Sequence, residues 1–315
     1  MSQVTTAVAH PNIALVKYWG KVPEADNIPA SPSLAITLDT LRTHTKIETS
    51  GADLIIINGK PVADPKITKF LARLRQDHSI PPLTIDTDNN FPTGAGLASS
   101  ASGFAALITA VNAHCQLGLS GEDCSTWARR GSGSAARSLC GGFSTLTQPH
   151  WHAQVLLDAA AWPLRVVIAI TDASRKSVSS TAGMERSRLT SPFYEAWLAS
   201  THLAYENARR AVLAHDFNTL ATIAQASALN MHAVMLSSQP PLVYWNAGTM
   251  AAMRCLSSLR EQDVPVFFTI DAGPQIKAVC QPDAAERVER ALRETPGILG
   301  VTTTGLGPAA RVIDA

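Results

Sequence analysis

The sequence feature that most limits the possible folds is residues 92–103, which read PTGAGLASSASG. Glycine and alanine let a backbone approach a ligand closely, and the apolar run after Ser100 is typical of a helix. A helix start exposes unpaired N–H groups and the positive end of the helix dipole, which together suit a phosphate. The hydroxyls of Ser99 and Ser100 could add donors or ligate Mg²⁺. The segment therefore predicts a phosphate-binding loop that leads into a helix.

This loop differs from two common phosphate-binding motifs. It lacks the Gly-Lys-Ser/Thr of a Walker A loop, and no strand leads directly into it, as a Rossmann fingerprint requires. A helix start built from small residues for close packing would have a similar sequence. This run, however, is longer and more distinctive than packing alone requires.

Two further segments combine cations with hydroxyl or aromatic groups. Residues 12–21 read NIALVKYWGK, in which Lys17 and Lys21 flank an aromatic pair. Residues 128–138 read ARRGSGSAARS, in which two serines and Arg137 could converge on one oxyanion. The planar guanidinium suits that task, because it pairs bidentately with carboxylate or phosphate. Taken singly, each segment also fits a structural role, as a solvated lysine pair or as an interhelical turn.

A carboxylate stands at the end of an apolar stretch in residues 266–274, VFFTIDAGP. Asp271 would be partly desolvated there and held by a Gly-Pro turn, which is a reasonable place for a base. Such turns are structural more often than catalytic. A fifth segment, residues 177–184, reads SVSSTAGM and is rich in hydroxyls.

These five segments resemble, in family order, motifs of the GHMP kinases, and of the diphosphomevalonate decarboxylases in particular. The loop is similar to the family pattern of a proline and small residues around Gly-Leu-x-Ser-Ser. Residues 128–138 match Arg-x-Gly-Ser-Gly-Ser-Ala-x-Arg-Ser almost residue for residue. The other three resemble Asn-Ile-Ala-x-x-Lys-Tyr-Trp-Gly-Lys, Ser-Ser-Thr-x-Gly-Met and Phe/Tyr-Thr-x-Asp-Ala-Gly-Pro. The similarity extends from residue 9 to about residue 308, which is nearly the whole chain.

The resemblance implies an α+β protein with the GHMP kinase fold. It implies a ribosomal-protein-S5-domain-2-like N-terminal domain and a ferredoxin-like α/β-sandwich C-terminal domain. The chain itself mixes strands and helices without regular βαβ alternation, which favours largely antiparallel sheets over a doubly wound fold. We place the boundary near Trp162 and Pro163, which gives domains of residues 1–163 and 164–315.

The resemblance also implies an activity. Diphosphomevalonate decarboxylases use ATP and Mg²⁺ to phosphorylate the 3-hydroxyl of (R)-5-diphosphomevalonate. Loss of phosphate and CO₂ then gives isopentenyl diphosphate, in isoprenoid biosynthesis by the mevalonate pathway. The sequence departs from the family pattern at Ser31-Pro32-Ser33, which leaves the phosphorylation state of the substrate open. The alternatives are a phosphomevalonate decarboxylase, a mevalonate 3-kinase and a non-catalytic GHMP-fold binding protein.

Site roles follow from the resemblance position by position. Asp271 would be the catalytic base or orienter, Arg137 would hold the substrate carboxylate, and Lys17 would lie by the reacting centre. Ser99 and Ser100 are the candidate ligands of Mg²⁺. The residues expected to bind the rest of the substrate are Tyr18, Lys21, Ser132, Ser134, Ser180 and Thr181. The residues expected to contact the nucleotide are Gly94, Gly96, Leu97, Ala98, Ser99 and Ser100.

Composition narrows the choice of partners. The formal net charge is +1, which argues against bulk attraction to nucleic acid or to an anionic membrane. The sequence has no stretch near the ~20 apolar residues of a membrane span and no evident signal peptide. The 5 cysteines form no CxxC pair, so a disulfide framework or zinc site is not expected. We expect a cytoplasmic protein with a phosphorylated mevalonate as small-molecule partner, and the resemblance adds a homodimer.

Hydrophobic periodicity and turn residues predict the elements along the chain. A hairpin is expected at Asn58-Gly59, because both residues tolerate positive φ. The predicted strands are residues 4–9, 33–41, 43–48, 54–57, 83–87, 164–171, 265–271, 298–304 and 311–313. The predicted helices are residues 66–76, 97–116, 122–130, 191–213, 217–235, 243–262 and 283–294.

Overall fold

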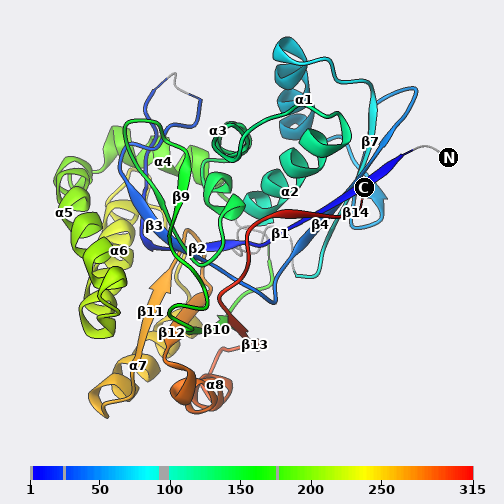
Figure 1. Ribbon diagram of the computed structural model, residues 1–315. Coiled ribbons are helices and arrows are strands. Elements are labelled where there is room, and N and C mark those ends of the chain that lie inside the picture. The colour runs from blue at the N-terminus through cyan, green and yellow to red at the C-terminus, as the bar shows by residue number, and fades with distance from the viewer. Residues whose placement is uncertain (1–2, 24–25, 92–98, 175–176, 315) are drawn as a thin grey trace.

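The computed structural model describes residues 3–23, 26–91, 99–174 and 177–314. Within these ranges the strands form three sheets, against which the helices pack (Figure 1). None of the helices in these ranges has the length and apolar character needed to cross a bilayer.

The first sheet has the strand order β14-β1-β4-β7-β5-β6. Apolar residues alternate along its central strands, so that Ala7, Ile47 and Ile85 share one face and pack against three helices. Its strands are β1 (Val4–Ala9), β4 (Thr43–Thr49), β5 (Leu54–Ile57), β6 (Lys60–Pro61), β7 (Leu83–Asn89) and β14 (Arg311–Asp314). The helices on that face are α1 (Pro65–Asp77), α2 (Ser99–His114) and α3 (Gly121–Gly131).

Short sequence motifs determine where several of these helices and strands begin or end. Asn58 and Gly59 have φ of 49° and 72°, so the predicted hairpin between β5 and β6 is confirmed. Helix α3 begins with a capping box, in which the side chains of Ser120 and Asp123 each accept from the other's backbone N–H. This helix ends directly before Ser132, which brings the serine-rich segment to the edge of the first sheet's helical layer.

The second sheet has the order β2-β3-β8-β9, and the third has the order β11-β12-β10-β13. One buried core joins them, because side chains of both sheets pack against α5 (Tyr194–Leu213) and α6 (Phe217–Leu236). The second sheet consists of β2 (Asn12–Val16), β3 (Ser33–Thr37), β8 (Phe143–Leu146) and β9 (Ala153–Leu157). The third consists of β10 (Arg165–Ile170), β11 (Val266–Ile270), β12 (Ile276–Cys280) and β13 (Gly300–Gly305).

The opposite face of the third sheet is covered by α7 (Ala247–Glu261) and α8 (Ala285–Arg293). Short 3₁₀ turns, η1 (Ala135–Leu139) and η2 (Pro282–Ala284), precede β8 and α8. The last strand, β14, returns to the first sheet and pairs antiparallel with β1 (Figure 1). The division into residues 1–163 and 164–315 remains a prediction.

The structure confirms most of the predicted helices and strands but adds several elements. The elements not predicted from the sequence are β2, β8, β9, β12, α4 (Ser180–Thr190) and the two 3₁₀ turns, and β6 was expected only as the second arm of the hairpin. Strands β2, β8 and β12 are buried along their whole length, so they lack the alternation that reveals a half-buried strand. Strand β3 ends at Thr37 rather than at residue 41, because beyond it the chain bends toward residues 304–307.

Candidate active site

A cleft of about 1510 Å³ runs between the helical layer of the first sheet and the segments around β2, α4 and the end of β11. Every described residue to which the sequence analysis gave a site role lines this cleft. They are Lys17, Tyr18, Lys21, Ser99, Ser100, Ser132, Ser134, Arg137, Ser180, Thr181 and Asp271. The other four predicted nucleotide contacts, Gly94, Gly96, Leu97 and Ala98, lie outside the described residues.

Two chain segments that are far apart in sequence meet at the base of the cleft. Lys17 directly follows β2, Asp271 directly follows β11, and Lys17 Nζ lies 2.6 Å from Asp271 Oδ1. The lysine side chain is 2% exposed and the aspartate 27% exposed. A second ammonium, from Lys277 on β12, lies 3.1 Å from Oδ2 of the same carboxylate. Both carboxylate oxygens are therefore held by buried cations.

This arrangement shifts the protonation of both groups. Burial lowers the pKa of Lys17 to about 8, although the Asp271 carboxylate favours the charged form and opposes the shift. Burial alone would raise the pKa of Asp271, but Lys17 and Lys277 outweigh it and hold that pKa well below its usual range. At neutral pH the aspartate is therefore ionised, and Lys17 is close to its own titration range.

The backbone of Asp271 is held by a neutral histidine. His232 Nε2 lies 3.1 Å from the Asp271 carbonyl oxygen, which can only accept, so the proton is on Nε2. Burial, together with the nearby Lys17, lowers the pKa of His232 to about 3. The imidazole ring also packs against Trp245, at a centroid distance of 4.7 Å.

A buried guanidinium faces the same cleft from η1. Arg137 Nε donates to Asn12 Oδ1 at 3.2 Å, and its Nη1 donates to the Ser33 hydroxyl. Asn12 in turn donates to the Ser134 carbonyl at 2.9 Å, which ties the serine-rich segment to β2. The guanidinium carbon lies 5.6 Å from the centroid of the Tyr18 ring. These contacts orient Arg137 while it remains beside the cleft.

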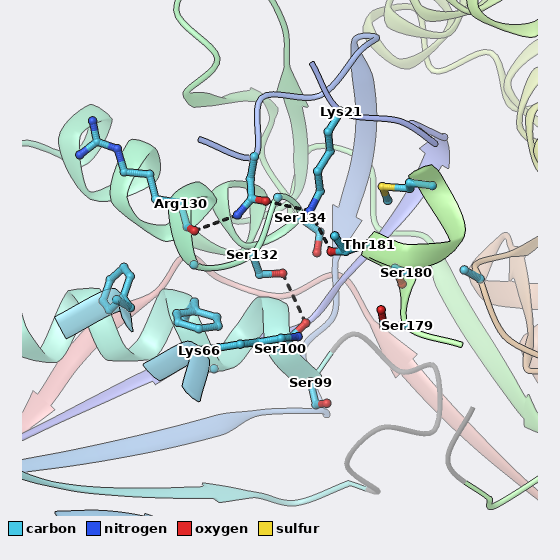
Figure 2. Close-up of a pocket in the computed structure, with 18 of the residues that line it drawn as sticks. Lys21, Lys66, Ser99, Ser100, Arg130, Ser132, Ser134, Ser179, Ser180 and Thr181 are labelled. Carbon is cyan, nitrogen blue, oxygen red and sulfur yellow. Dashed lines mark hydrogen bonds between the residues drawn. The ribbon is translucent and has the colours of Figure 1, made fainter. Parts of the chain in front are cut away.

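Hydroxyl and ammonium groups gather farther along the cleft, as Figure 2 shows. Lys21 Nζ donates to Asn27 Oδ1 at 2.7 Å and to Thr181 Oγ1 at 2.9 Å. Ser100 Oγ, on the first turn of α2, lies 3.3 Å from Ser132 Oγ. Ser179 caps α4 by accepting from the Ala182 N–H, so the start of this helix also faces the cleft.

These groups together suit a large anion that carries phosphates. Lys17, Lys277 and Arg137 bring three buried cations against the single, partly exposed carboxylate of Asp271, and the fully buried side chains of the described residues include no acid. The helix starts of α2 and α4 add oriented N–H groups and hydroxyls. Mg²⁺ usually takes few protein ligands and several phosphate oxygens, so the hydroxyls of Ser99 and Ser100 fit such a site. The described part of the chain has no cluster of three His, Cys, Asp or Glu side chains for a metal.

Several site residues were not found from the sequence. Ser33 and Asn12 hold Arg137, and Asn27 holds Lys21. Asn12 lies in a recognised motif without having been given a role. Lys277 had one sequence signal, since it is a lysine within the otherwise apolar stretch IKAVC. His232 had none, because it lies inside a long helix.

Comparisons with known proteins agree with this architecture. Residues 9–155 match the family model of the diphosphomevalonate decarboxylase-like N-terminal domain. Residues 166–298 match that of the mevalonate 5-diphosphate decarboxylase C-terminal domain. A solved structure of MDDEF in complex with MVAPP, AMPPCP and magnesium has a TM-score of 0.92 and 34% identity, with 100% of both chains covered.

Curated relatives cover nearly the same length. Diphosphomevalonate decarboxylase mvd1 of Aspergillus fumigatus is 37% identical, over 96% of this chain and 82% of that protein. Phosphomevalonate decarboxylase of Haloferax volcanii is 30% identical, over 98% of this chain and 97% of that protein.

The fold and the cleft show that this is a two-domain α+β protein with the GHMP kinase fold. Within that class, the chain belongs to the diphosphomevalonate decarboxylase family. The fold class and the family predicted from the sequence are therefore confirmed.

Proposed function

We propose that this protein catalyses the ATP-dependent decarboxylation of (R)-5-diphosphomevalonate in the mevalonate pathway of isoprenoid biosynthesis. The products are isopentenyl diphosphate, ADP, phosphate and CO₂. The observation that carries the proposal is the contact of Lys17 with Asp271 in a cleft that Arg137 also lines. The membership of the chain in this family supports the same reaction.

In the proposed mechanism, Asp271 orients the 3-hydroxyl of the substrate toward the γ-phosphorus of ATP. A carboxyl with so low a pKa holds a proton poorly, so it accepts a hydrogen bond first and takes the proton as the phosphoryl group is transferred. Lys17 stabilises the negative charge on the transferring group and on the phosphate that later leaves.

Arg137 holds the substrate carboxylate during these steps. The C–O bond to the 3-phosphate breaks, the electron pair of the C–C bond to the carboxylate forms the new double bond, and CO₂ departs. Because Asn12 and Ser33 fix the guanidinium, its fork is oriented before the substrate arrives.

The remaining cleft residues are proposed to bind the phosphates. The substrate diphosphate would contact Tyr18, Lys21, Ser132, Ser134, Ser180 and Thr181. The nucleotide phosphates would contact the start of α2 and the preceding loop, and Ser99 and Ser100 would hold Mg²⁺. When bound, Mg²⁺ neutralises charge on these phosphates.

A monophosphate substrate is the second candidate, because the Haloferax volcanii relative is named a phosphomevalonate decarboxylase. The test is to incubate the protein with ATP and Mg²⁺ and with mevalonate, 5-phosphomevalonate or 5-diphosphomevalonate, and to measure ADP and CO₂. We expect both products fastest from 5-diphosphomevalonate. Faster release from 5-phosphomevalonate would assign the second candidate. ADP without CO₂ from mevalonate would indicate a 3-kinase, and no product would indicate a binding protein.

We also propose that the protein is a cytoplasmic homodimer, as the family resemblance implies. Sedimentation equilibrium at micromolar concentration would give twice the mass of the 33.4 kDa chain. A single species with the mass of one chain would contradict this proposal.

A further inference from the structure

A lysine occupies a core position on β12. Side chains alternate across a strand, and Val279 on β12 and Phe267 on β11 both belong to the core between the sheets. Lys277 precedes Val279 by two residues and pairs in register with Thr269 of β11. It therefore lies on the same face, where its neighbour Ile168 on β10 is also a core residue.

Burial of an ammonium is costly unless it is paired with an opposite charge. The Lys277 side chain is 2% exposed, and the carboxylate it contacts is Asp271 Oδ2, at 3.1 Å. A methionine of similar length would fill this core position without that cost. Its ion pair with Asp271 therefore explains the lysine at this position better than packing does.

Lys277 approaches the carboxylate from the side away from the large cleft. Lys17 and Asp271 both line that cleft, whereas Lys277 is not among its lining residues. Together with Asp271 and Asn12, it instead borders a small cavity of about 10 Å³ between the sheets. The lysine is therefore placed to act on the substrate through Asp271.

We propose that Lys277 is a positioning residue for the reaction, which holds Oδ2 of Asp271 so that Oδ1 stays aligned with Lys17 and the substrate hydroxyl. This inference rests on the proposed function. The torsion that rotates an aspartate carboxylate has broad minima, so a single contact at Oδ1 leaves the carboxylate plane free to turn. Two contacts, one on each oxygen, fix it.

The lysine also sets the charge around the reacting groups. Lys17, Arg137 and His232 are the other titratable or charged side chains around Asp271, and His232 is neutral. Lys277 lowers the pKa of Asp271 by attraction and lowers the pKa of Lys17 by repulsion. Its removal should therefore raise both pKa values.

The test compares Lys277→Met and Lys277→Gln with the wild-type protein in the decarboxylation assay, over a range of pH. We expect kcat to fall about 10- to 100-fold in Lys277→Met, because a misaligned reacting group costs that much, while KM changes less than about threefold. Lys277→Gln keeps a hydrogen-bond donor and should retain more activity. In both variants the acid and alkaline limbs of the kcat/KM profile should move to higher pH.

Val279→Ala is the matched control, since it opens a cavity on the same face of β12 without changing charge. It should lower the unfolding temperature and leave both pH limbs in place. If the limbs of both Lys277 variants coincide with those of the wild type, or if kcat stays within threefold, the inference is wrong. If the wild type releases no CO₂ from any mevalonate phosphate, the proposed function itself fails.

Discussion

Lys17 and Asp271 are separated by 254 positions, yet their charged atoms lie 2.6 Å apart. Burial and neighbouring charge together set the protonation state of this pair. A desolvated carboxylate would normally hold its proton, and two buried ammonium groups keep it ionised instead. The excess of buried cations over acids leaves room for the negative charge of a phosphorylated acid. Substrate binding would therefore complete the charge balance of the site.

Asp271→Asn tests the role of the carboxylate directly. This change keeps the shape of the side chain but removes its charge and its ability to accept a proton. We expect kcat to fall by roughly 10²- to 10⁴-fold, the usual contribution of a positioned acid or base. Isothermal titration should still detect binding of nucleotide and substrate. Turnover within about threefold of the wild type would remove Asp271 from its proposed role.

Both kcat/KM and the stability of the fold should depend on the protonation of Lys17. Because the pKa of Lys17 is lowered to about 8, its ammonium loses its proton as pH rises through that value. We expect kcat/KM to be level from pH 6 to about 7.5 and then to fall by about tenfold per pH unit. Below pH 8 the buried ammonium of Lys17 costs stability, and this cost is relieved as pH rises from 8 to 10.5, because the unfolded chain binds a proton there that the folded chain has released. Circular dichroism should therefore show a folded protein at pH 9, and a kcat/KM that is still level at pH 9.5 would contradict the assignment.

The site residues differ in how far sequence could identify them. Motifs identified Lys17, Arg137 and Asp271 as candidates, because each stands in a distinctive local pattern. No local pattern encodes which of them touch, since contacts such as that of Lys277 with Asp271 depend on the strand register. His232 acts through such a contact and carries no local sequence signal, whereas Ser33 stands out only as part of a departure from the family pattern.

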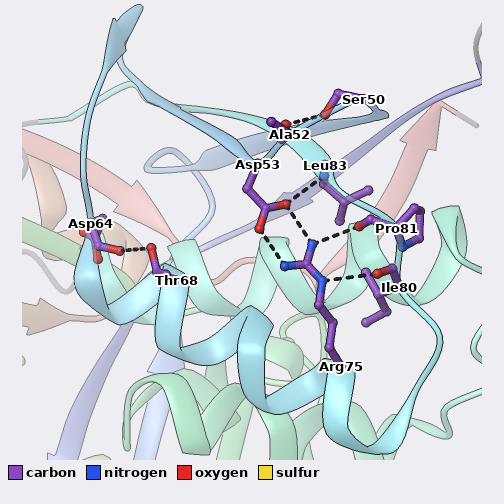
Figure 3. A network of polar contacts seen from close by, with 9 residues as sticks. All are labelled: Ser50, Ala52, Asp53, Asp64, Thr68, Arg75, Ile80, Pro81 and Leu83. Atoms are coloured by element: carbon purple, nitrogen blue, oxygen red, sulfur yellow. Dashed lines mark hydrogen bonds and ion pairs between the residues drawn. The ribbon is translucent and has the colours of Figure 1, made fainter.

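Helix α1 is held at its C-terminal end by Arg75 (Figure 3). Arg75 makes a bidentate pair with Asp53, with distances of 2.6 and 2.7 Å. The same guanidinium donates to the carbonyls of Ile80 and Pro81, at 3.1 and 2.9 Å. Asp53 also accepts from the Leu83 N–H at 2.9 Å, so this network joins α1 to the starts of β5 and β7.

We predict that Arg75→Met lowers the free energy of unfolding by about 1–2 kcal/mol, because it removes charge-assisted bonds at a partly exposed site. Arg209→Met is the control, since Arg209 forms an exposed pair with Glu206 on one helix and should cost less than about 0.5 kcal/mol. Urea unfolding of both variants gives the comparison. Equal losses in the two would show that the network does not hold the helix.

The elements show what periodicity can and cannot reveal. Amphipathic helices such as α1, and half-buried strands such as β1 and β4, were predicted within a few residues, because one face of each is buried and the other is not. Fully buried strands such as β2 and β12 carry no such contrast. Strand β2 directly precedes Lys17, and β12 contains Lys277. The part of the site around these two lysines is therefore the part that hydrophobic periodicity predicts least well.

At the scale of the whole molecule, the site exists only where distant parts of the chain meet. The Thr269 hydroxyl of β11 donates to the Ala14 carbonyl of β2 at 3.2 Å, just below the contact of Lys17 with Asp271. The core between the second and third sheets extends beneath this point. Packing of the two sheets around α5 and α6 therefore sets the distance between the catalytic candidates.

The proposed reaction couples phosphoryl transfer to loss of CO₂ in this cleft. The most direct measurement uses 5-diphosphomevalonate labelled at the carboxylate carbon, with ATP and Mg²⁺, and counts labelled CO₂ and ADP in the same sample. One CO₂ should be released for each ADP throughout the reaction. ADP that accumulates without CO₂, or the absence of both products, would contradict the proposed reaction.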